Sequence, residues 1–321
     1  MLECKKGIKL AEEHIPINVL SFTDSTTGKK FYTPESDIVF QSIFGKPGNE
    51  KITKAFLQSI LSSEVEDFTL NANPKFSSSN VNDKQQIADV KAICKESNNT
   101  ILLDMQYRTH PCLTERFTIY AYRRYNEYLG NGTDYSSLKK VTLIVILAHN
   151  LSKFKNIESY HTVWNIREKE FSNFVFNEDV TIHLIELPKY IKQKKETNKI
   201  NPWLEFLIEP LGKGVEEALR TEEELRKAVD LLKILNSDEE VRTIAEAEVF
   251  AEIDRRSELN FARRESFEKG EKRGEKRAIE QIANKLLKNG MSIEDIIQAT
   301  NIDEKILKKL ILKNNMSECL K

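Results

Sequence analysis

Residues 87–108 read IADVKAICKESNNTILLDMQYR, and this stretch decides the fold of the first half of the chain. Two apolar segments flank the polar sequence KESNN, which predicts two antiparallel strands joined by a turn. Each segment carries one carboxylate, Asp89 in the first and Asp104 in the second. Strand alternation puts Asp104 and Gln106 on one face, and a turn centred on residues 96–97 sets Asp89 directly opposite Asp104.

The facing acids allow two interpretations. Like charges opposite each other in a sheet are destabilising, and a hard divalent cation would turn that repulsion into attraction. Alternatively, both carboxylates face water and Lys91 neutralises one of them. Because the pattern of two acids and a glutamine is short, the residues alone leave both interpretations open.

Charge, cysteine content and apolar runs limit which classes of protein this chain can belong to. The 321 residues include 49 basic and 50 acidic ones, for a net charge of −1, so a nucleic-acid partner requires a local basic patch. Four cysteines without a CxxC pair argue against a zinc site and favour a reducing cytoplasm. The most apolar run, VTLIVILA at 141–148, is too short to span a bilayer, and we find no signal peptide. We therefore expect a soluble, cytoplasmic protein without a membrane partner.

The pattern along the chain predicts four parts. Residues 1–30 are expected to form an irregular lead-in and residues 31–190 a mixed α/β domain. A polar linker at 192–202, KQKKETNKINP, follows this domain. Residues 191–277 are expected to form a helical extension with a charged helix, and residues 278–321 a small helical module.

Within the α/β domain, apolar periodicity predicts helices and strands in mixed order. Helices are expected at 34–45, 50–62 and 113–129. Strands are expected at 69–76, on both sides of KESNN, and at 141–148, 157–166 and 179–187.

The order of these segments resembles the PD-(D/E)XK nuclease superfamily. A helix with DIVFQSIFG, a strand with DVKA, a strand with DMQ and the helix RFTIYAYRRYNEYL carry the resemblance. More narrowly, the chain is similar to the bacterial recombination-promoting nuclease and putative transposase family over about residues 31–312, including the tail EKGEKRGEKRAIEQIANKLLKNGMSIEDIIQATNI. The resemblance implies a restriction-endonuclease-like core, a mixed sheet flanked by helices, with an all-helical C-terminal extension. It also implies metal-dependent cleavage of a DNA phosphodiester.

The resemblance also assigns roles to residues. It implies that Asp89 and Asp104 are the two motif acids, and that Gln106 stands where the superfamily often has Lys and this family commonly has Gln. Asp37 matches an acidic position in the first helix that supports the metal site. The sequence departs from the family at Ala88, which stands in place of Pro. It also departs at Asp104, where the family usually has the longer Glu.

Mg²⁺ is the expected cofactor, with Mn²⁺ as an alternative. Asp89 and Asp104 would be direct ligands, and the backbone carbonyl of Met105 a third. The ion would lower the pKa of the attacking water and offset charge on the phosphoryl group. Gln106 would orient the water or donate to a phosphate oxygen. Asp37 would be a weak or outer ligand, or simply an acid favoured by the helix dipole.

The helix expected at 113–129 offers candidate DNA contacts, Arg116, Tyr120, Arg123 and Arg124. Arginine suits phosphate and tyrosine can stack on bases, whereas an amphipathic helix would instead pack its tyrosines on the sheet. We expect Arg116 and Tyr120 to lie nearest the site.

The C-terminal region is expected to be helical and highly charged. The segment 255–277 could lie along DNA, but i,i+4 ion pairs favour a solvated helix. Ser292 with Asp295 and Asn301 with Glu304 resemble two capping boxes. The short helices that follow could read DNA or bind protein, and we favour protein contact.

Three functions remain open from the sequence. The first is a metal-dependent DNA endonuclease linked to recombination or transposition of mobile DNA, with a homodimer expected if two strands are cut. The second is a catalytically inert DNA-binding or protein-interaction member of the fold. The third is a transposase that joins strands.

Overall fold

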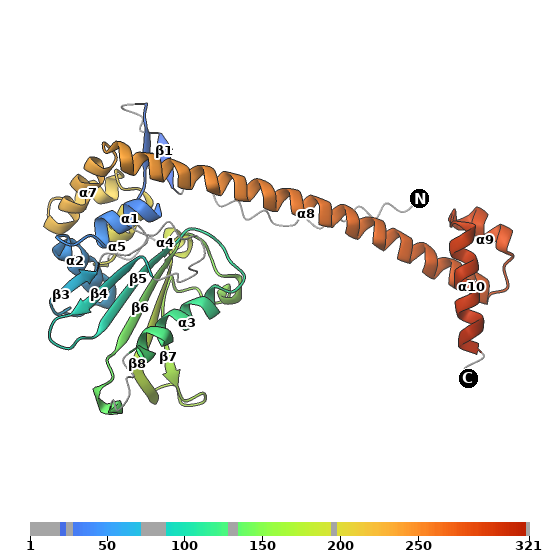
Figure 1. Ribbon diagram of the computed structural model, residues 1–321, viewed down its shortest axis with the longest axis horizontal. Helices are drawn as coiled ribbons and strands as arrows, with labels where there is room; N and C mark the ends of the chain where they lie inside the picture. The colour runs from blue at the N-terminus through green and yellow to red at the C-terminus, as the bar shows by residue number, and fades with distance from the viewer. Residues whose placement is uncertain (1–19, 24–27, 72–87, 128–133, 194–197, 319–321) are drawn as a thin grey trace. The chain divides into compact units, whose positions relative to one another are not determined.

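The two apolar segments around KESNN form neighbouring strands of a mixed six-stranded sheet (Figure 1). In chain order the strands are β3 (Phe68–Asn71), β4 (Val90–Cys94), β5 (Thr100–Gln106), β6 (Val141–Leu147), β7 (His161–Arg167) and β8 (Val175–Glu186). Their order across the sheet is β3-β4-β5-β6-β8-β7. Strands β5, β6 and β8 run parallel, and the other neighbours are antiparallel.

The computed structural model describes residues 20–23, 28–71, 88–127, 134–193 and 198–318. The chain divides into two compact units, Met1–Phe250 and Ala251–Lys321. The expected strand at 69–76 is described only as β3, because residues 72–87 lie outside the described part.

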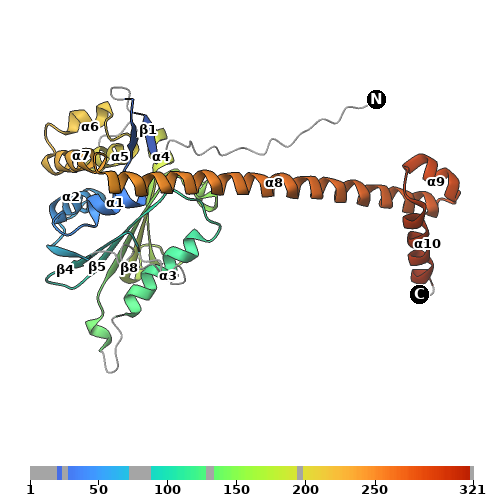
Figure 2. The ribbon, with the colours of Figure 1, turned by 45° about the horizontal axis from the view of Figure 1, so that its top comes forward.

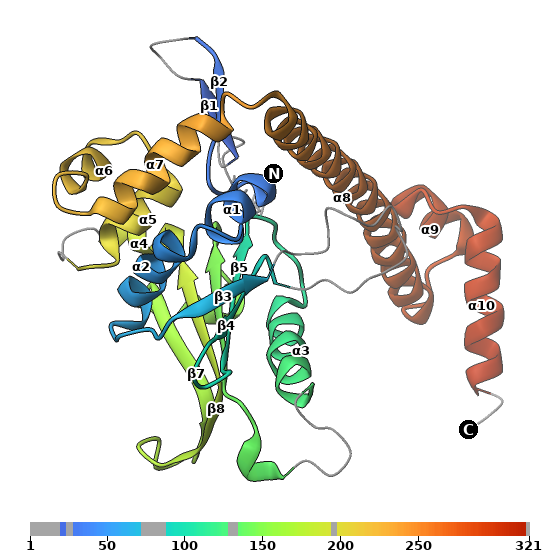
Figure 3. The same cartoon turned by 60° about the vertical axis from the view of Figure 1, so that its left-hand side comes forward.

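Helices cover both faces of the sheet, which explains why β6 reads as a continuous apolar run. On one face lie α1 (Asp37–Phe44), α2 (Glu50–Leu61), α5 (Asn201–Ile208) and α7 (Glu223–Leu235), and on the other lies α3 (Leu113–Asn126) (Figure 3). Alternate residues of β6 pack against the helices on the two faces of the sheet. Ile144 and Ile146 belong to the core under α1 and α2, whereas Leu143 and Val145 pack with Phe117 of α3.

The helices that follow the sheet complete the same core. They are α4 (Leu187–Gln193), α5, α6 (Lys213–Ala218) and α7, and they gather beside α1 and α2 (Figure 2). Trp203 of α5 lies 5.3 Å from Phe56 and 6.2 Å from Phe44, measured between ring centroids. The structure therefore differs from the boundary expected at residue 190. The polar linker made that boundary plausible, but the aromatic side chains after it fill the core of the first unit.

The N-terminal region also differs from expectation in its described part. Strand β1 (Ser21–Thr23) pairs with β2 (Lys30–Tyr32), so a segment predicted to be irregular contains a strand. Two short 3₁₀ helices, Tyr135–Ser137 and Ser152–Phe154, lie in the loops before and after β6.

The C-terminal helices are α8 (Glu239–Lys288), α9 (Ile293–Thr300) and α10 (Glu304–Glu318). The predicted cap at Ser292 is confirmed, because its hydroxyl oxygen accepts a hydrogen bond from the Asp295 amide at 3.2 Å. The predicted cap at Asn301 is wrong. Asn301 instead ends α9 in a left-handed conformation, and Asp303 accepts from the Lys305 amide at 2.8 Å.

A small apolar cluster holds the second unit together. Its buried members are Ala283, Ile296, Ile302 and Leu307. No helix in the described part of the chain is both long enough and apolar enough to cross a membrane.

Candidate active site

The register of β4 and β5 brings the two acids face to face. The ladder pairs Val90 with Leu103, so the next position sets Asp89 opposite Asp104, and the predicted register is confirmed. The side chains of Asp89 and Asp104 are buried, with exposed fractions of 4% and 2%. The interpretation that both carboxylates face water is therefore wrong.

Hydrogen bonds fix both carboxylates in place. Asp89 Oδ1 accepts from Gln41 Nε2 at 3.0 Å, and Asp89 Oδ2 accepts from the Met105 amide at 2.9 Å. Asp104 Oδ2 accepts from Gln106 Nε2 at 2.7 Å. Since the donors come from α1 and from β5 itself, the acids are held by the fold without any ligand.

Gln41 is a site residue that sequence reasoning missed. It lies in the helix sequence DIVFQSIF, four residues after Asp37 and therefore on the same side of α1. Its side chain is buried among apolar neighbours, where a polar group needs a partner. The signal was present, because a glutamine interrupts the apolar run of this helix.

Asp37 lies in the first turn of α1 and is half-buried. Among the described residues, no three His, Cys, Asp or Glu side chains come together in a group that could hold a metal ion. The structure thus brings Asp89 and Asp104 together but does not add Asp37 as a third member of such a group. Its supporting role stays a prediction.

A distant glutamate caps α1. The Ser36 hydroxyl donates to Glu248 Oε2 at 2.6 Å, and the Ile38 amide donates to Glu248 Oε1 at 3.1 Å. Burial raises the pKa of Glu248, and the hydrogen bonds from Ser36, Ile38 and Asp37 together with the charge of Arg108 oppose that rise. Glu248 of α8 thus anchors the helix that carries Gln41.

Replacing Glu248 is expected to change stability in a pH-dependent way. Glu248→Ala should lower the free energy of unfolding by about 1–2 kcal/mol, because α1 loses its cap. In the wild type the pKa of Glu248 is raised in the folded state above its ordinary value of about 4.5. Its contribution to the free energy of unfolding is therefore fully present below that ordinary pKa, and it is lost as pH rises through the raised pKa. Glu248→Gln has no proton to lose. Its free energy of unfolding, measured by urea titration, should therefore rise relative to that of the wild type over this pH range.

The neighbouring exposed Glu246 provides a control for this series. Glu246→Gln should leave the pH dependence of unfolding unchanged. Equal effects at the two positions would contradict the capping role of Glu248.

Helix α3 places a cation and a phenol beside the acids. The Arg116 guanidinium lies 5.4 Å from the ring centroid of Tyr120. Burial raises the pKa of Tyr120, Arg116 opposes the rise, and the charges of Asp104 and Asp89 add to it, so the phenol lies close to both acids. Within the described chain, Nε of Arg116 is buried and has no hydrogen-bond partner. A buried free donor of this kind is suited to a phosphate oxygen.

The other two candidate DNA contacts on α3 lie elsewhere. Arg124 donates to Thr100 Oγ1 at 3.2 Å and pairs with Glu127. Arg123 is exposed to solvent. Lys91 is half-buried beside this end of α3, where burial and the charge of Arg124 lower its pKa.

The donor set fits a hard divalent cation. Asp89 and Asp104 offer carboxylate oxygens, and Mg²⁺ in proteins is commonly held by one or two carboxylates while it keeps waters and binds substrate phosphates. A bound divalent cation would offset the repulsion between these two buried carboxylates. Asp89 and Asp104 are therefore the groups that would hold it, and the role expected for the Met105 carbonyl stays a prediction.

Gln41→Leu is expected to reduce metal-dependent activity by about 10- to 100-fold, as loss of a partner that orients a metal ligand typically does. The leucine keeps the volume but removes the donor to Asp89, so we expect weaker Mg²⁺ binding in calorimetry. Gln58→Leu on α2, the same substitution at a half-buried glutamine of a neighbouring helix, is the control. Equal losses of activity in both variants would indicate that disturbed packing, and not the lost hydrogen bond to Asp89, causes the effect.

Comparison with known proteins identifies the family. No curated protein and no solved structure matches the chain. A family model described as PD-(D/E)XK nuclease family transposase matches residues 34–262. This span is more than half of the chain and contains α1, the whole sheet and both acids. The chain therefore belongs to the PD-(D/E)XK nuclease family of transposases.

Proposed function

We propose that this protein is a Mg²⁺-dependent DNA endonuclease that hydrolyses a phosphodiester bond, with Mn²⁺ able to substitute. One observation carries the proposal: Asp89, directly before β4, and Asp104 of the adjacent strand β5 are both buried at opposed positions and held by fixed donors, in a member of a nuclease family. The family implies DNA as the substrate. We further propose that the reaction serves recombination or transposition of mobile DNA.

The roles of the residues follow from their chemistry. A bound divalent ion would lower the pKa of water and offset charge on the phosphoryl oxygens. Gln106 donates its amide to Asp104, which leaves its Oε1 to accept a hydrogen bond from the attacking water. Because an amide does not take up a proton at neutral pH, Gln106 orients water and does not act as a base. Arg116 supplies a buried donor for a phosphate oxygen.

A second candidate function is an inert DNA-binding or protein-interaction role. The observation that favours it is Asp104, whose carboxylate is one methylene shorter than the Glu usual in the family. Asp104→Glu should therefore retain or raise activity in an active enzyme. The same variant would recover activity if the shorter side chain had silenced the site.

Nicking of supercoiled plasmid tests the proposed function. We expect relaxed circles in Mg²⁺ or Mn²⁺ and none in EDTA, with DNA binding measured in parallel by fluorescence anisotropy. Binding without nicking in either metal would support the inert alternative. Joined products with a linear donor DNA would support strand transfer.

A further inference from the structure

A pocket of about 360 Å³ lies where two parallel strands of the sheet end. It is lined by residues of the segment 150–158, which follows β6, and by residues of α4, which follows β8. We call it the α4 pocket. Ligand pockets in proteins span about 300–1,000 Å³, and this pocket has the volume of about twelve waters. A phosphate ion alone would therefore fill only part of it.

The α4 pocket lies at the same edge of the sheet as the candidate active site. Strands β5, β6 and β8 run parallel, and their last residues, Gln106, Leu147 and Glu186, are aligned across the sheet. The Ala148 amide donates to the Gln106 carbonyl oxygen at 3.0 Å. Asn150 of the pocket follows two residues later, within about 7 Å of chain. The pocket thus lies beside the end of the strand that carries a candidate metal ligand.

The lining of the α4 pocket is basic. Among the described residues that line it, three are lysines, Lys155, Lys189 and Lys192, and one is an acid, Glu158. Glu186 forms an ion pair with Lys189, and the two acids together still leave a net positive charge. A terminal phosphate carries a charge of about −1.5 to −2 at pH 7, whereas a backbone phosphate of DNA carries one negative charge. The lysines therefore favour a terminal phosphate.

Lys189 is a buried cation that the fold holds in place. Its ammonium group donates to the Phe154 carbonyl oxygen at 3.1 Å and pairs with Glu186, and the residue is 7% exposed. Glu186 is fixed in turn, because the Leu151 amide donates to its Oε1 at 2.8 Å. Within the described chain these contacts use two of the three donors of the ammonium group. The third is available to an occupant of the pocket, and Ser152 of the lining adds a hydroxyl.

Other groups of the lining suit a base or a sugar. Leu151 and Ile157 give the pocket apolar walls. The Oδ1 atom of Asn150 is buried and accepts no hydrogen bond within the described residues. A base amino group or a sugar hydroxyl can donate to this oxygen, whereas an ionised phosphate has little to donate. Since a buried acceptor gains from a partner, the lining fits a nucleotide better than a simple anion.

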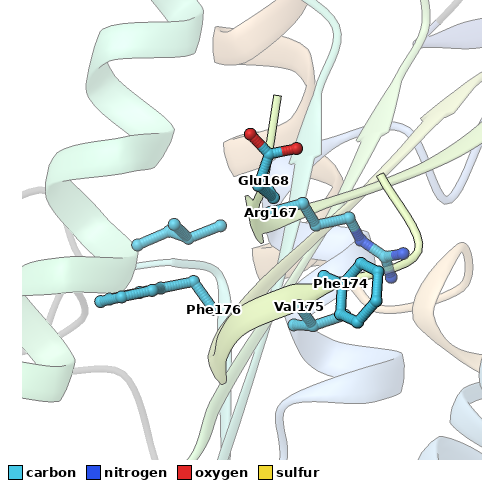
Figure 4. A pocket seen from close by; sticks show the side chains of 6 residues that line it. Arg167, Glu168, Phe174, Val175 and Phe176 are labelled. Atoms are coloured by element: carbon cyan, nitrogen blue, oxygen red, sulfur yellow. The ribbon is translucent and has the colours of Figure 1, made fainter. Parts of the chain in front are cut away.

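A second surface pocket, of about 540 Å³, lies on β7 and β8 and differs in chemistry (Figure 4). It is lined by Ile166, Arg167, Glu168, Phe174, Val175 and Phe176. In Figure 4 the side chain of Phe174 lies beside the guanidinium of Arg167, and Phe176 points away from it. One arginine is balanced by one glutamate among apolar side chains, so this pocket does not select a phosphate.

We propose that the α4 pocket binds a nucleotide through its terminal phosphate. The phosphate contacts Lys155, Lys189 and Lys192, and the nucleoside lies against Leu151 and donates to Asn150. Two sources supply this chemistry, a free mononucleotide and the phosphorylated end of a DNA strand. Hydrolysis of a phosphodiester leaves such an end, so the DNA source rests on the proposed function. Binding of a free nucleotide does not rest on it.

Isothermal titration calorimetry of the full chain in EDTA tests this proposal. Because the proposed cleavage needs a metal, the outcome is independent of nuclease activity. The probes are deoxyadenosine 5′-monophosphate, its 3′ isomer, deoxyadenosine and inorganic phosphate. We expect a monophosphate to bind about 10- to 100-fold more tightly than deoxyadenosine and inorganic phosphate. No binding of either monophosphate at about 1 mM, or equally tight binding of inorganic phosphate, would overturn the proposal.

The double variant Lys155→Ala/Lys192→Ala should bind the monophosphate about 10- to 100-fold more weakly. Both side chains are exposed, so its circular dichroism should match that of the wild type. Lys189 is kept, because its loss would leave Glu186 buried without its cation. Asn150→Ala should weaken binding of the monophosphate about 2- to 10-fold and leave that of inorganic phosphate unchanged.

The matched control is Lys213→Ala/Lys233→Ala, which removes the same charge at exposed positions of α6 and α7. We expect this variant to bind the monophosphate like the wild type. Equal weakening in the two double variants would mean that net charge alone attracts the nucleotide, and it would overturn the proposal.

Short single-stranded oligonucleotides with and without a terminal phosphate distinguish the two sources, with binding in EDTA measured by fluorescence anisotropy. If the phosphorylated strand binds more tightly than the mononucleotide and Lys155→Ala/Lys192→Ala removes that difference, the occupant is a DNA end. If the strand binds no more tightly than the mononucleotide, the occupant is a free nucleotide. Either result supports the pocket as a nucleotide site.

Discussion

Asp89→Asn and Asp104→Asn are each expected to lower metal-dependent nicking by at least about 10³-fold. Each change keeps the size of the side chain and one acceptor oxygen but removes a charge that would hold the ion. An ion of this kind supplies several kcal/mol of transition-state stabilisation, and each 1.36 kcal/mol is a factor of ten in rate. The measurement is the initial rate of supercoiled plasmid loss in Mg²⁺ at saturating protein.

The stability of these variants separates a functional loss from misfolding. In EDTA Asp104→Asn should not unfold at a lower temperature than the wild type, since a neutral amide relieves the repulsion between the buried acids. Asp89→Asn loses one of the two acceptor oxygens that hold Gln41 and Met105, so it should unfold at a somewhat lower temperature while keeping its circular dichroism spectrum. Mg²⁺ should raise the unfolding temperature of the wild type only, because a ligand stabilises the state that binds it. Asp230→Asn, at an exposed position of α7, is the control and should nick normally. Nicking retained in both site variants would place the activity elsewhere.

Phe206→Ala is expected to lower the free energy of unfolding by about 3–5 kcal/mol, the usual cost of truncating a buried phenylalanine. Phe206 of α5 is fully buried and lies 6.3 Å from Trp203 and 6.5 Å from Phe44, measured between ring centroids. Because Phe44 belongs to α1, the loss should affect the helix that carries Gln41. Urea denaturation followed by circular dichroism measures the effect.

Phe250→Ala is the matched control, because the Phe250 side chain is 56% exposed. A surface change of this kind usually alters stability by no more than about 0.5 kcal/mol. If residues 187–250 formed a separate unit, Phe206→Ala would leave the unfolding of the sheet unchanged. We instead expect the sheet and these helices to unfold in one transition.

The sequence predicted the elements of the candidate site and their register. Alternation in two short segments set Asp89 opposite Asp104, and the ladder between β4 and β5 has that register. The mixed sheet flanked by helices, with a helical C-terminal region, that the family resemblance implied is confirmed by the described elements. The strands and their register depend on neighbours in the chain, so local periodicity was sufficient to predict them, whereas the core type came from the family resemblance.

Only the tertiary structure decided which groups support the acids. Gln41 reaches Asp89 across 48 residues, and Glu248 caps α1 across more than 200 residues. Sequence periodicity indicates which face of a helix is apolar, but not which distant residue satisfies a buried polar group. The boundary expected at residue 190 failed for the same reason, because the polar linker is local and the aromatic packing beyond it is not. Pattern along the chain therefore determined the strands and their acids, and long-range packing determined their environment.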